Sequence, residues 1–265
     1  MRTVGSLVSV IMVLAASVEP LRAQSLDAKD WVAAYCKLGG KASLYNGQAD
    51  IVGVTKLRGQ EPNVKLGEIA PAKGIRKVLL GRHGVLDEDL IALAHWDKLE
   101  EVDVFDGERV TDAGLKAVAA IPTLKSLVLM DTAVTGEGLA ALSGHKQLAF
   151  LKIANPDTTG SVHAVSLTDM PRLGRLMLNC PGLEQLSVTK MPSLHEVERL
   201  PASMKSAEFA DVGELTELEF RTSTLANLSI KGAPKLKLID LRNTKVSKET
   251  LAEIRGKLPN TVVKW

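Results

Sequence analysis

The stretch from Pro171 to Leu241 decides the fold of this chain. It reads PRLGRLML (171–178), PGLEQLSV (181–188), PSLHEVERL (192–200), ASMKSAEF (202–209), GELTELEF (213–220), STLANLSI (223–230) and PKLKLIDL (234–241). An apolar-x-x-apolar pattern opens in these segments at Leu173, Leu183, Leu194, Met204, Leu215, Leu225 and Leu236. They are alternately 10 and 11 residues apart, so the true period is 21 residues with two short strands in each. A fixed period near 20 is typical of a solenoid, in which each coil contacts only its neighbours.

The same pattern extends toward the N-terminus with a longer period. Strand-like segments open at Ile51, Ile75, Leu99, Leu124, Leu148 and Leu173, with steps of 24, 24, 25, 24 and 25 residues. Each opens an apolar-x-x-apolar-x-apolar template, as in Leu124-x-x-Leu127-x-Leu129. The period of two inside the template predicts a strand whose alternate side chains point inward.

The segments that return to the next strand differ between the two halves. Thr111-Asp112-Ala113-Gly114-Leu115 has a hydroxyl at a helix N-cap and an acid in the first turn, which predicts a helix. Val110 can pack on Leu115 across that cap. Similar segments begin at Thr135 and Ser247. Beyond Leu148–Leu173 the return shortens, which predicts strands in place of helices.

The strand template and the T-D-x-G-L phrase resemble the leucine-rich-repeat family, and in particular secreted bacterial proteins with helical repeats of this type. The resemblance covers most of residues 45–265. It implies an α/β fold, a right-handed solenoid with a parallel concave β-sheet. Helical return legs are expected in the N-terminal half and strand return legs in the C-terminal half. The phrase is similar also to repeats of ubiquitin-ligase F-box adaptors, although no F-box can be read in this sequence.

Three segments are expected along the chain. Residues 1–23 have a positive start, an uncharged apolar run and a small residue before a plausible cleavage point, which predicts a signal peptide. A transmembrane anchor is the alternative, but about 15 apolar residues is short for a span. Residues 24–45 predict a helical cap, and residues 46–265 the repeat array with its own C-terminal cap. This organisation predicts a secreted or periplasmic protein with no membrane span after cleavage.

Charge and cysteine content limit the function classes. The net charge of the 265 residues is +2, without a basic stripe, which argues against nucleic acid as a partner. Cys36 lies in the expected cap and Cys180 after the sixth strand start, on the order of 25–30 Å apart at about 4.8 Å per strand. A disulfide requires α-carbons within about 7 Å, so the two are expected to be unpaired buried thiols.

Catalytic and metal-binding motifs are not recognised in the sequence. The histidines are His83, His95, His145, His163 and His195, and none is spaced from another as in a zinc-protease helix. Isolated loop histidines are more often solvated than ligating. His83 has no evident acid or thiol partner. We therefore expect that the protein is not an enzyme, that it has no catalytic residue, and that it binds no cofactor or metal.

The concave face offers a candidate binding site. In the strand template, the residues flanking the second and third apolar positions point outward, and six of them are apolar: Leu79, Phe105, Val128, Met130, Phe150 and Met177. A contiguous apolar patch on a monomer marks an interaction site. Farther along, Glu196, Glu198, Glu217, Glu219 and Asp240 form an expected acidic strip. An error in register and an ordinary solvated face are the alternatives for the patch, and a solvated face is the favoured reading of the strip.

The sequence therefore predicts a non-catalytic scaffold that binds a protein partner of unknown identity through the concave face. A structural or self-associating cell-envelope protein that uses the same patch to form a homodimer is the alternative. An enzyme ranks last, because it would need a cleft that joins His83 or His163 to acids.

Overall fold

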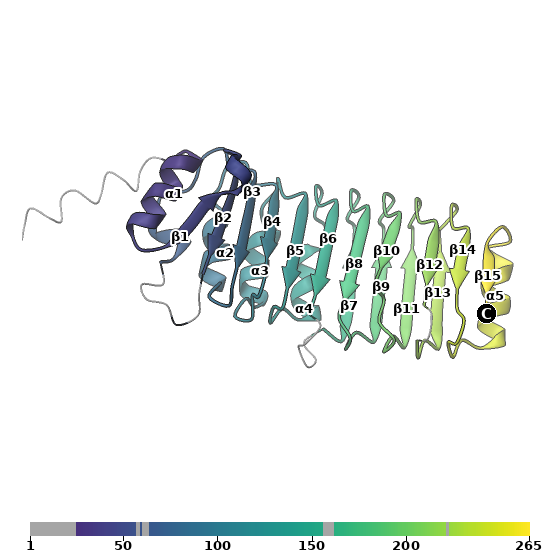
Figure 1. The fold of residues 1–265 in the computed structure, drawn as a ribbon. Coiled ribbons are helices and arrows are strands. Elements are labelled where there is room, and N and C mark those ends of the chain that lie inside the picture. The colour runs from purple at the N-terminus through teal and green to yellow at the C-terminus, as the bar shows by residue number, and fades with distance from the viewer. Residues whose placement is uncertain (1–24, 57–58, 60–63, 156–161, 221–222) are drawn as a thin grey trace, which may run out of the picture.

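The computed structural model describes residues 25–56, 59, 64–155, 162–220 and 223–265. The expected signal peptide (1–23) and most of the loop after Asn155 lie outside these residues. Figure 1 shows the described chain as an elongated row of strands, with helices at both ends and along one side of the first half. Among the described residues, no helix is both long and apolar enough to cross a bilayer.

The elements are short and mostly strands. The helices are α1 (Ala28–Lys37), α2 (Asp87–Leu93), α3 (Asp112–Ala119), α4 (Gly136–Leu139) and α5 (Lys248–Lys257), with 3-10 turns η2 (Tyr45–Gly47), η3 (Leu66–Glu68) and η4 (Ala140–Leu142). The first strands are β1 (Lys41–Leu44), β2 (Ile51–Thr55), β3 (Lys77–Gly81), β4 (Glu101–Val104), β5 (Ser126–Met130), β6 (Phe150–Ala154), β7 (Ala164–Thr168) and β8 (Arg175–Asn179). The last are β9 (Gln185–Thr189), β10 (Glu196–Glu198), β11 (Ser206–Ala210), β12 (Glu217–Glu219), β13 (Asn227–Lys231), β14 (Leu238–Asp240) and β15 (Val262–Lys264). The fold is mixed α/β, as expected.

The largest sheet, called here the front sheet, has the order β1-β2-β3-β4-β5-β6-β8-β10. Every pairing in it is parallel except that of β1 with β2. Its register aligns one fully buried row, made of Val78, Val102, Leu127, Leu151 and Leu176. Leu and Val recur in this row because each of these strands has a similar strand on either side, and its inward side chain packs against theirs.

From β7 onward the chain alternates between two faces. Strands β7, β9, β11 and β13 form a parallel back sheet, and β12, β14 and β15 form a third, terminal sheet. The alternating spacing of 10 and 11 residues is the distance from a strand on one face to the next strand on the other. Figure 1 shows the two sets of strands interleaved along the second half of the molecule.

The T-D-x-G-L phrase has a structural cause in the first half. Oδ1 of Asp87 accepts hydrogen bonds from the backbone N–H groups of Thr111 (2.8 Å) and Gly114 (3.1 Å), and its Oδ2 accepts one from the Thr111 hydroxyl (2.6 Å). The acid of one repeat thus caps the helix of the next. A Cβ on Gly114 would lie 2.5 Å from Oδ1 of Asp87, so the glycine is required by this close contact.

The same device occurs once more and then stops. Asp112 accepts hydrogen bonds from the N–H and hydroxyl of Thr135, and a Cβ on Gly138 would lie 1.9 Å from its Oδ1. The next residue in the position of the acid is Gly136. A Cβ there would lie 1.7 Å from the carbonyl oxygen of Ala164, because α4 abuts β7 directly. The acid is therefore replaced by glycine where a helix, α4, lies directly against a strand of the back sheet, β7.

The first helix covers the N-terminal end of the core. Trp31 stacks on Tyr35 with ring centroids 5.1 Å apart and meets Trp96 edge-on at 5.2 Å. The Tyr35 hydroxyl donates to the carbonyl of Val64 at 2.9 Å. Leu38 is the C-cap of the helix, and nearly half of its surface is exposed. At the other end, α5 packs beside β13 and β15 pairs with β14.

Candidate protein-binding faces

The outward residues of the front sheet, called here the front face, contain all six of the predicted apolar residues. The register runs Leu79, Asp103, Val128, Lys152 and Met177 along the middle row. Leu79, Val128 and Met177 thus alternate with charged residues. Side chains on adjacent strands of one face contact each other directly, so this row is mixed and not continuously apolar.

The other three predicted residues lie in the flanking rows. Phe150 sits between Ser126 and Arg175, and the Arg175 guanidinium lies 5.8 Å from its ring centroid. Phe105 directly follows β4, and Met130 is the last residue of β5. Both lie at the opposite margin of the face from Phe150. All six side chains are partly buried. The structure brings them onto one face but divides them among three rows.

Ion pairs bind the N-terminal part of this face together. Lys77 Nζ lies 2.7 Å from Oδ2 of Asp103 and 3.1 Å from Oε2 of Glu101, and Arg76 bridges Asp50 and Glu101. Burial lowers the pKa of Lys77, but its hydrogen bonds to Asp103 and Glu101 outweigh that effect, and the net pKa is raised. Lys77 is therefore a neutralised part of the scaffold and not a free cation.

The predicted acidic strip falls where the front sheet ends. Strand β10 pairs with β8, and β12 pairs with β14, but β10 and β12 belong to different sheets. A cleft of about 780 Å³ opens there, lined by His195, Glu196, Val197, Glu198, Arg199, Leu200, Thr216, Glu217 and Glu219. Val197 is only partly buried at a position where Leu176 and Leu218 are fully buried.

Basic residues neutralise much of that strip. Arg175 pairs with Glu196 at 2.5 Å and with Glu198 at 2.9 Å, and Arg242 forms two hydrogen bonds to Asp240. The hydrogen bond between the two glutamates raises the pKa of Glu196, and together with Arg175 it lowers the pKa of Glu198. These pairs agree with the reading of the strip as an internally balanced, solvated surface.

Two histidine expectations are wrong. His83 does have an acid neighbour, because its Nδ1 lies 3.2 Å from Oε1 of Glu108 in the next repeat. His145 is not a solvated loop residue: it is 9% exposed, its Nε2 lies 2.9 Å from the carbonyl of Ile121, and its Nδ1 accepts from the N–H of Leu148 at 3.0 Å. The His83 pair is about half exposed, and His145 connects two neighbouring repeats.

The cysteines and metal ligands can also be placed. Cys180 is buried and Cys36 is exposed, so the expectation of two buried thiols is wrong for Cys36, which lies on the solvent side of α1; both are free. In the part of the chain that the structure describes, no group of three or more His, Cys, Asp or Glu side chains could hold a metal ion.

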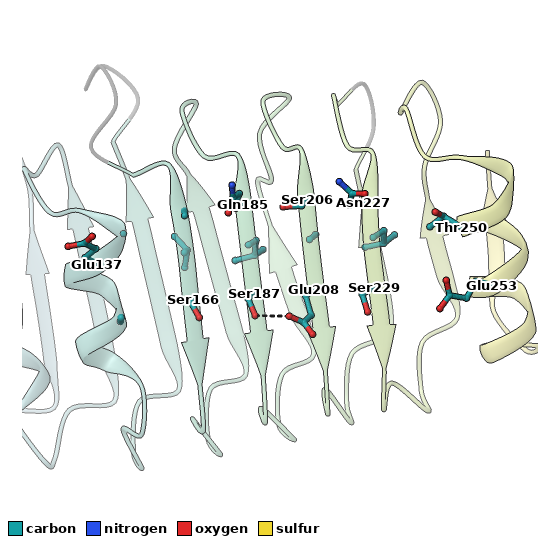
Figure 2. A pocket seen from close by; sticks show the side chains of 17 residues that line it. Glu137, Ser166, Gln185, Ser187, Ser206, Glu208, Asn227, Ser229, Thr250 and Glu253 are labelled. Carbon is teal, nitrogen blue, oxygen red and sulfur yellow. Dashed lines mark hydrogen bonds between the residues drawn. The ribbon is translucent and has the colours of Figure 1, made fainter.

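A second concave surface was missed by sequence reasoning. It lies over the back sheet and has a volume of about 770 Å³. Figure 2 shows its floor, formed by outward side chains of β7, β9, β11 and β13, and its two ends at α4 and α5. The floor row Ser166, Ser187, Glu208 and Ser229 recurs at intervals of 21 residues, which is the signal that could have revealed it.

A curated relative contradicts the expected location. The chain is 29% identical over 161 residues to "Antagonist of mitotic exit network protein 1" of the fungus Eremothecium gossypii. The match covers 57% of this chain and 40% of the relative. A protein named for the mitotic exit network is not secreted or periplasmic, so the predicted secreted or periplasmic location is wrong. That prediction rested on the charge, the apolar run and the plausible cleavage point of residues 1–23, which lie outside the described residues. The fungal relative also lends no support to a bacterial subtype.

A family model agrees with the repeat pattern. Residues 120–143, from the end of α3 through β5 to η4, match the family described as Leucine Rich repeat. The matched segment contains the strand template at Leu124 and the helix start at Thr135. This match and the parallel sheets together support a leucine-rich-repeat protein.

Proposed function

We propose that this protein is a non-catalytic scaffold that binds a protein partner through the front face. Leucine-rich-repeat proteins are generally protein-binding scaffolds. The observation that carries the proposal is the middle row of the front face, where apolar and charged side chains alternate on a rigid parallel ladder. The relative is named an antagonist, an activity that a binding protein can perform by occupying a partner's surface.

The proposal includes the architecture that presents this face. The chain is a right-handed solenoid, with residues 24–45 as the N-terminal cap and residues 46–265 as the repeat array. Its return legs are helices in the first half and strands in the second. Support comes from the successive pairing of β2 to β6 and from the alternation of later strands between two sheets. Such an array holds its surface side chains in fixed positions, which lowers the entropy lost on binding.

The front face has the composition that protein interfaces favour. Phe105 and Met130 supply apolar contact area, and aromatic residues, methionine and arginine are enriched at interfaces. Lys152 lies between Val128 and Met177 in the middle row, and no ion pair to it is found in the described chain. A partner with an acidic residue opposite Lys152 and apolar residues beside it would match this pattern.

The test compares two double variants of equal charge change. Phe105→Glu/Met130→Glu places two carboxylates on the front face, and Ala113→Glu/Ala141→Glu places two on exposed helical positions. Each variant must first match the wild type in circular dichroism and melting. Proteins captured from an extract of the source cells are then purified and titrated by calorimetry.

We expect the front-face variant to lose binding by about 2 kcal/mol or more, because buried unpaired charges are strongly disfavoured, and the helix variant to bind normally. Equal affinity for both variants would refute the front-face proposal. Sedimentation at rising concentration separates partner binding from self-association through the same face. A dimer that dissociates only in the front-face variant would favour the self-associating alternative.

A further inference from the structure

The hollow over the back sheet, called here the back trough, is built by the change of return legs. Helix α4 contacts β7 at one edge of the back sheet, and α5 contacts β13 at the other. Four strands lie between the helices and leave a floor of short side chains, which include Ala164, Ser166, Ser187, Ser206 and Ser229 (Figure 2). The trough exists because a strand is thinner than a helix in the direction perpendicular to the sheet, so the flanking helices rise above the four strands.

Every charged residue that lines the back trough is a glutamate. Glu137 comes from α4, Glu208 from β11 and Glu253 from α5, and Figure 2 shows them at one end, on the floor and at the other end. Glu208 accepts a hydrogen bond from the Ser187 hydroxyl at 3.2 Å, and Lys257, which does not line the trough, pairs with Glu253. The whole chain carries a net charge of +2, so this local negative charge is not a general property of the surface.

The floor can form hydrogen bonds but cannot accept an added strand. Gln185, Ser206 and Asn227 are aligned in one outward row of the back sheet, beside the row of serines. Both edges of the sheet are covered by helices, so a ligand cannot extend it by β-addition. An occupant must therefore lie across the strands and be recognised by side chains.

We propose that the back trough binds a lysine- or arginine-rich segment of a protein partner, lying across the back sheet from α4 to α5. Its cations pair with Glu137, Glu208 and Glu253, while the serines, Gln185 and Asn227 bind its backbone. The four strands span about 14 Å, so roughly four to five extended residues cross the floor. This site lies apart from the front face and does not depend on the function proposed for that face.

The probe is a fluorescein-labelled octapeptide of alternating lysine and serine, and its counterpart has glutamate in place of lysine. Fluorescence anisotropy measures binding to the full chain at low and high salt. The test variant is Glu137→Gln/Glu208→Gln/Glu253→Gln, which changes three exposed side chains. The matched control is Glu196→Gln/Glu217→Gln/Glu219→Gln on the cleft between β10 and β12. Ser206→Arg is a second test variant that places a cation on the trough floor.

We expect the lysine peptide to bind with a Kd on the order of 1 mM or tighter and the glutamate peptide not to bind. Each exposed glutamate contributes about two- to fivefold, so the triple trough variant weakens binding about tenfold or more. Ser206→Arg weakens it as well, and the control variant binds like the wild type. The proposal is overturned by a wild type that does not bind the lysine peptide, by equal binding to the trough variants, or by an equal loss in the control.

Discussion

The Nζ of Lys56 lies 2.6 Å from Oδ2 of Asp89, and both side chains are almost completely buried. Lys56 follows β2, and Asp89 belongs to the first turn of α2. The carboxylate also accepts hydrogen bonds from the backbone N–H groups of Leu66 (3.1 Å) and Leu86 (3.0 Å). One ion pair therefore joins the first repeat to the chain around η3 and to the second helix.

Removing the cation alone should be costly. We expect Lys56→Met to lower the free energy of unfolding by about 3–5 kcal/mol, because it leaves a buried carboxylate without a counter-charge. Lys56→Met/Asp89→Asn should be more stable than the single variant, since it leaves no buried charge and the amide oxygen can still accept from one of the two N–H groups. Urea denaturation measures both. A double variant less stable than Lys56→Met would show that the pair is not the dominant contact.

The contact between Asp87 and Gly114 predicts that the effects of substituting these two residues are coupled. In the wild type, Gly114→Ala should destabilise by about 1–3 kcal/mol, because the new Cβ meets Oδ1 of Asp87. In an Asp87→Ala background the contacts with the carboxyl group are gone and only the 3.2 Å contact with the Cα of residue 87 remains, so the same change should cost at least about 1 kcal/mol less than in the wild type. Thermal or urea unfolding of the four proteins gives the coupling energy. Equal effects of Gly114→Ala in both backgrounds would contradict this explanation of the motif.

Substitution of alanine for two helical glycines should change the stability of the protein in opposite directions. Gly136→Ala places a Cβ against the carbonyl of Ala164 and should cost about 3 kcal/mol, because backbone cannot easily move away. Gly256 lies in α5, and a Cβ added to it would have nothing within 4 Å. Gly256→Ala should therefore stabilise by about 0.5–1 kcal/mol. Melting temperatures report both, and a tolerated Gly136→Ala would mean that α4 and β7 are less closely packed.

Burial of Cys180 predicts a loss of stability at alkaline pH. Burial raises the pKa of its thiol from 9.0 to about 11. The protonated form is favoured by the folded state, so this contribution is complete below pH 9 and is lost as the pH rises from about 9 to 11. Urea unfolding between pH 8.5 and 10 should show a smaller fall in stability for Cys180→Ala than for the wild type. Cys36→Ala, at the exposed thiol, should keep the slope of the wild type.

The sequence predicted the repeating elements well because each repeat is stabilised by its nearest neighbours. Leu173, Leu183, Leu194 and Met204 open segments that fold as β8, β9, β10 and β11, each two residues later. The inward residues of these strands recur with period two, so the buried rows follow from local pattern alone. Thr111 and Thr135 were likewise correct helix starts, because an N-cap and its helix lie within a few residues.

The surfaces could be predicted only in part. The sequence identified the six outward apolar residues. In the structure, the pairing of the strands places Asp103 and Lys152 between them and divides the six among three rows. The neighbours of Arg175, Phe150 on one strand and Glu198 on another, are 25 and 23 residues away in the chain. Which side chain faces which across a sheet depends on pairing between repeats, and composition does not specify it.

By itself, the sequence determined the mixed α/β class, the period and the apolar residues that form the buried rows, because these depend on side-chain pattern within one repeat. Tertiary structure decided the burial of Lys56 against Asp89, the break between β10 and β12, and the trough between α4 and α5. Each of these depends on how unlike elements stack on one another. The space left between two helices by four shallower strands is a property of the assembled layers, and no single repeat contains it.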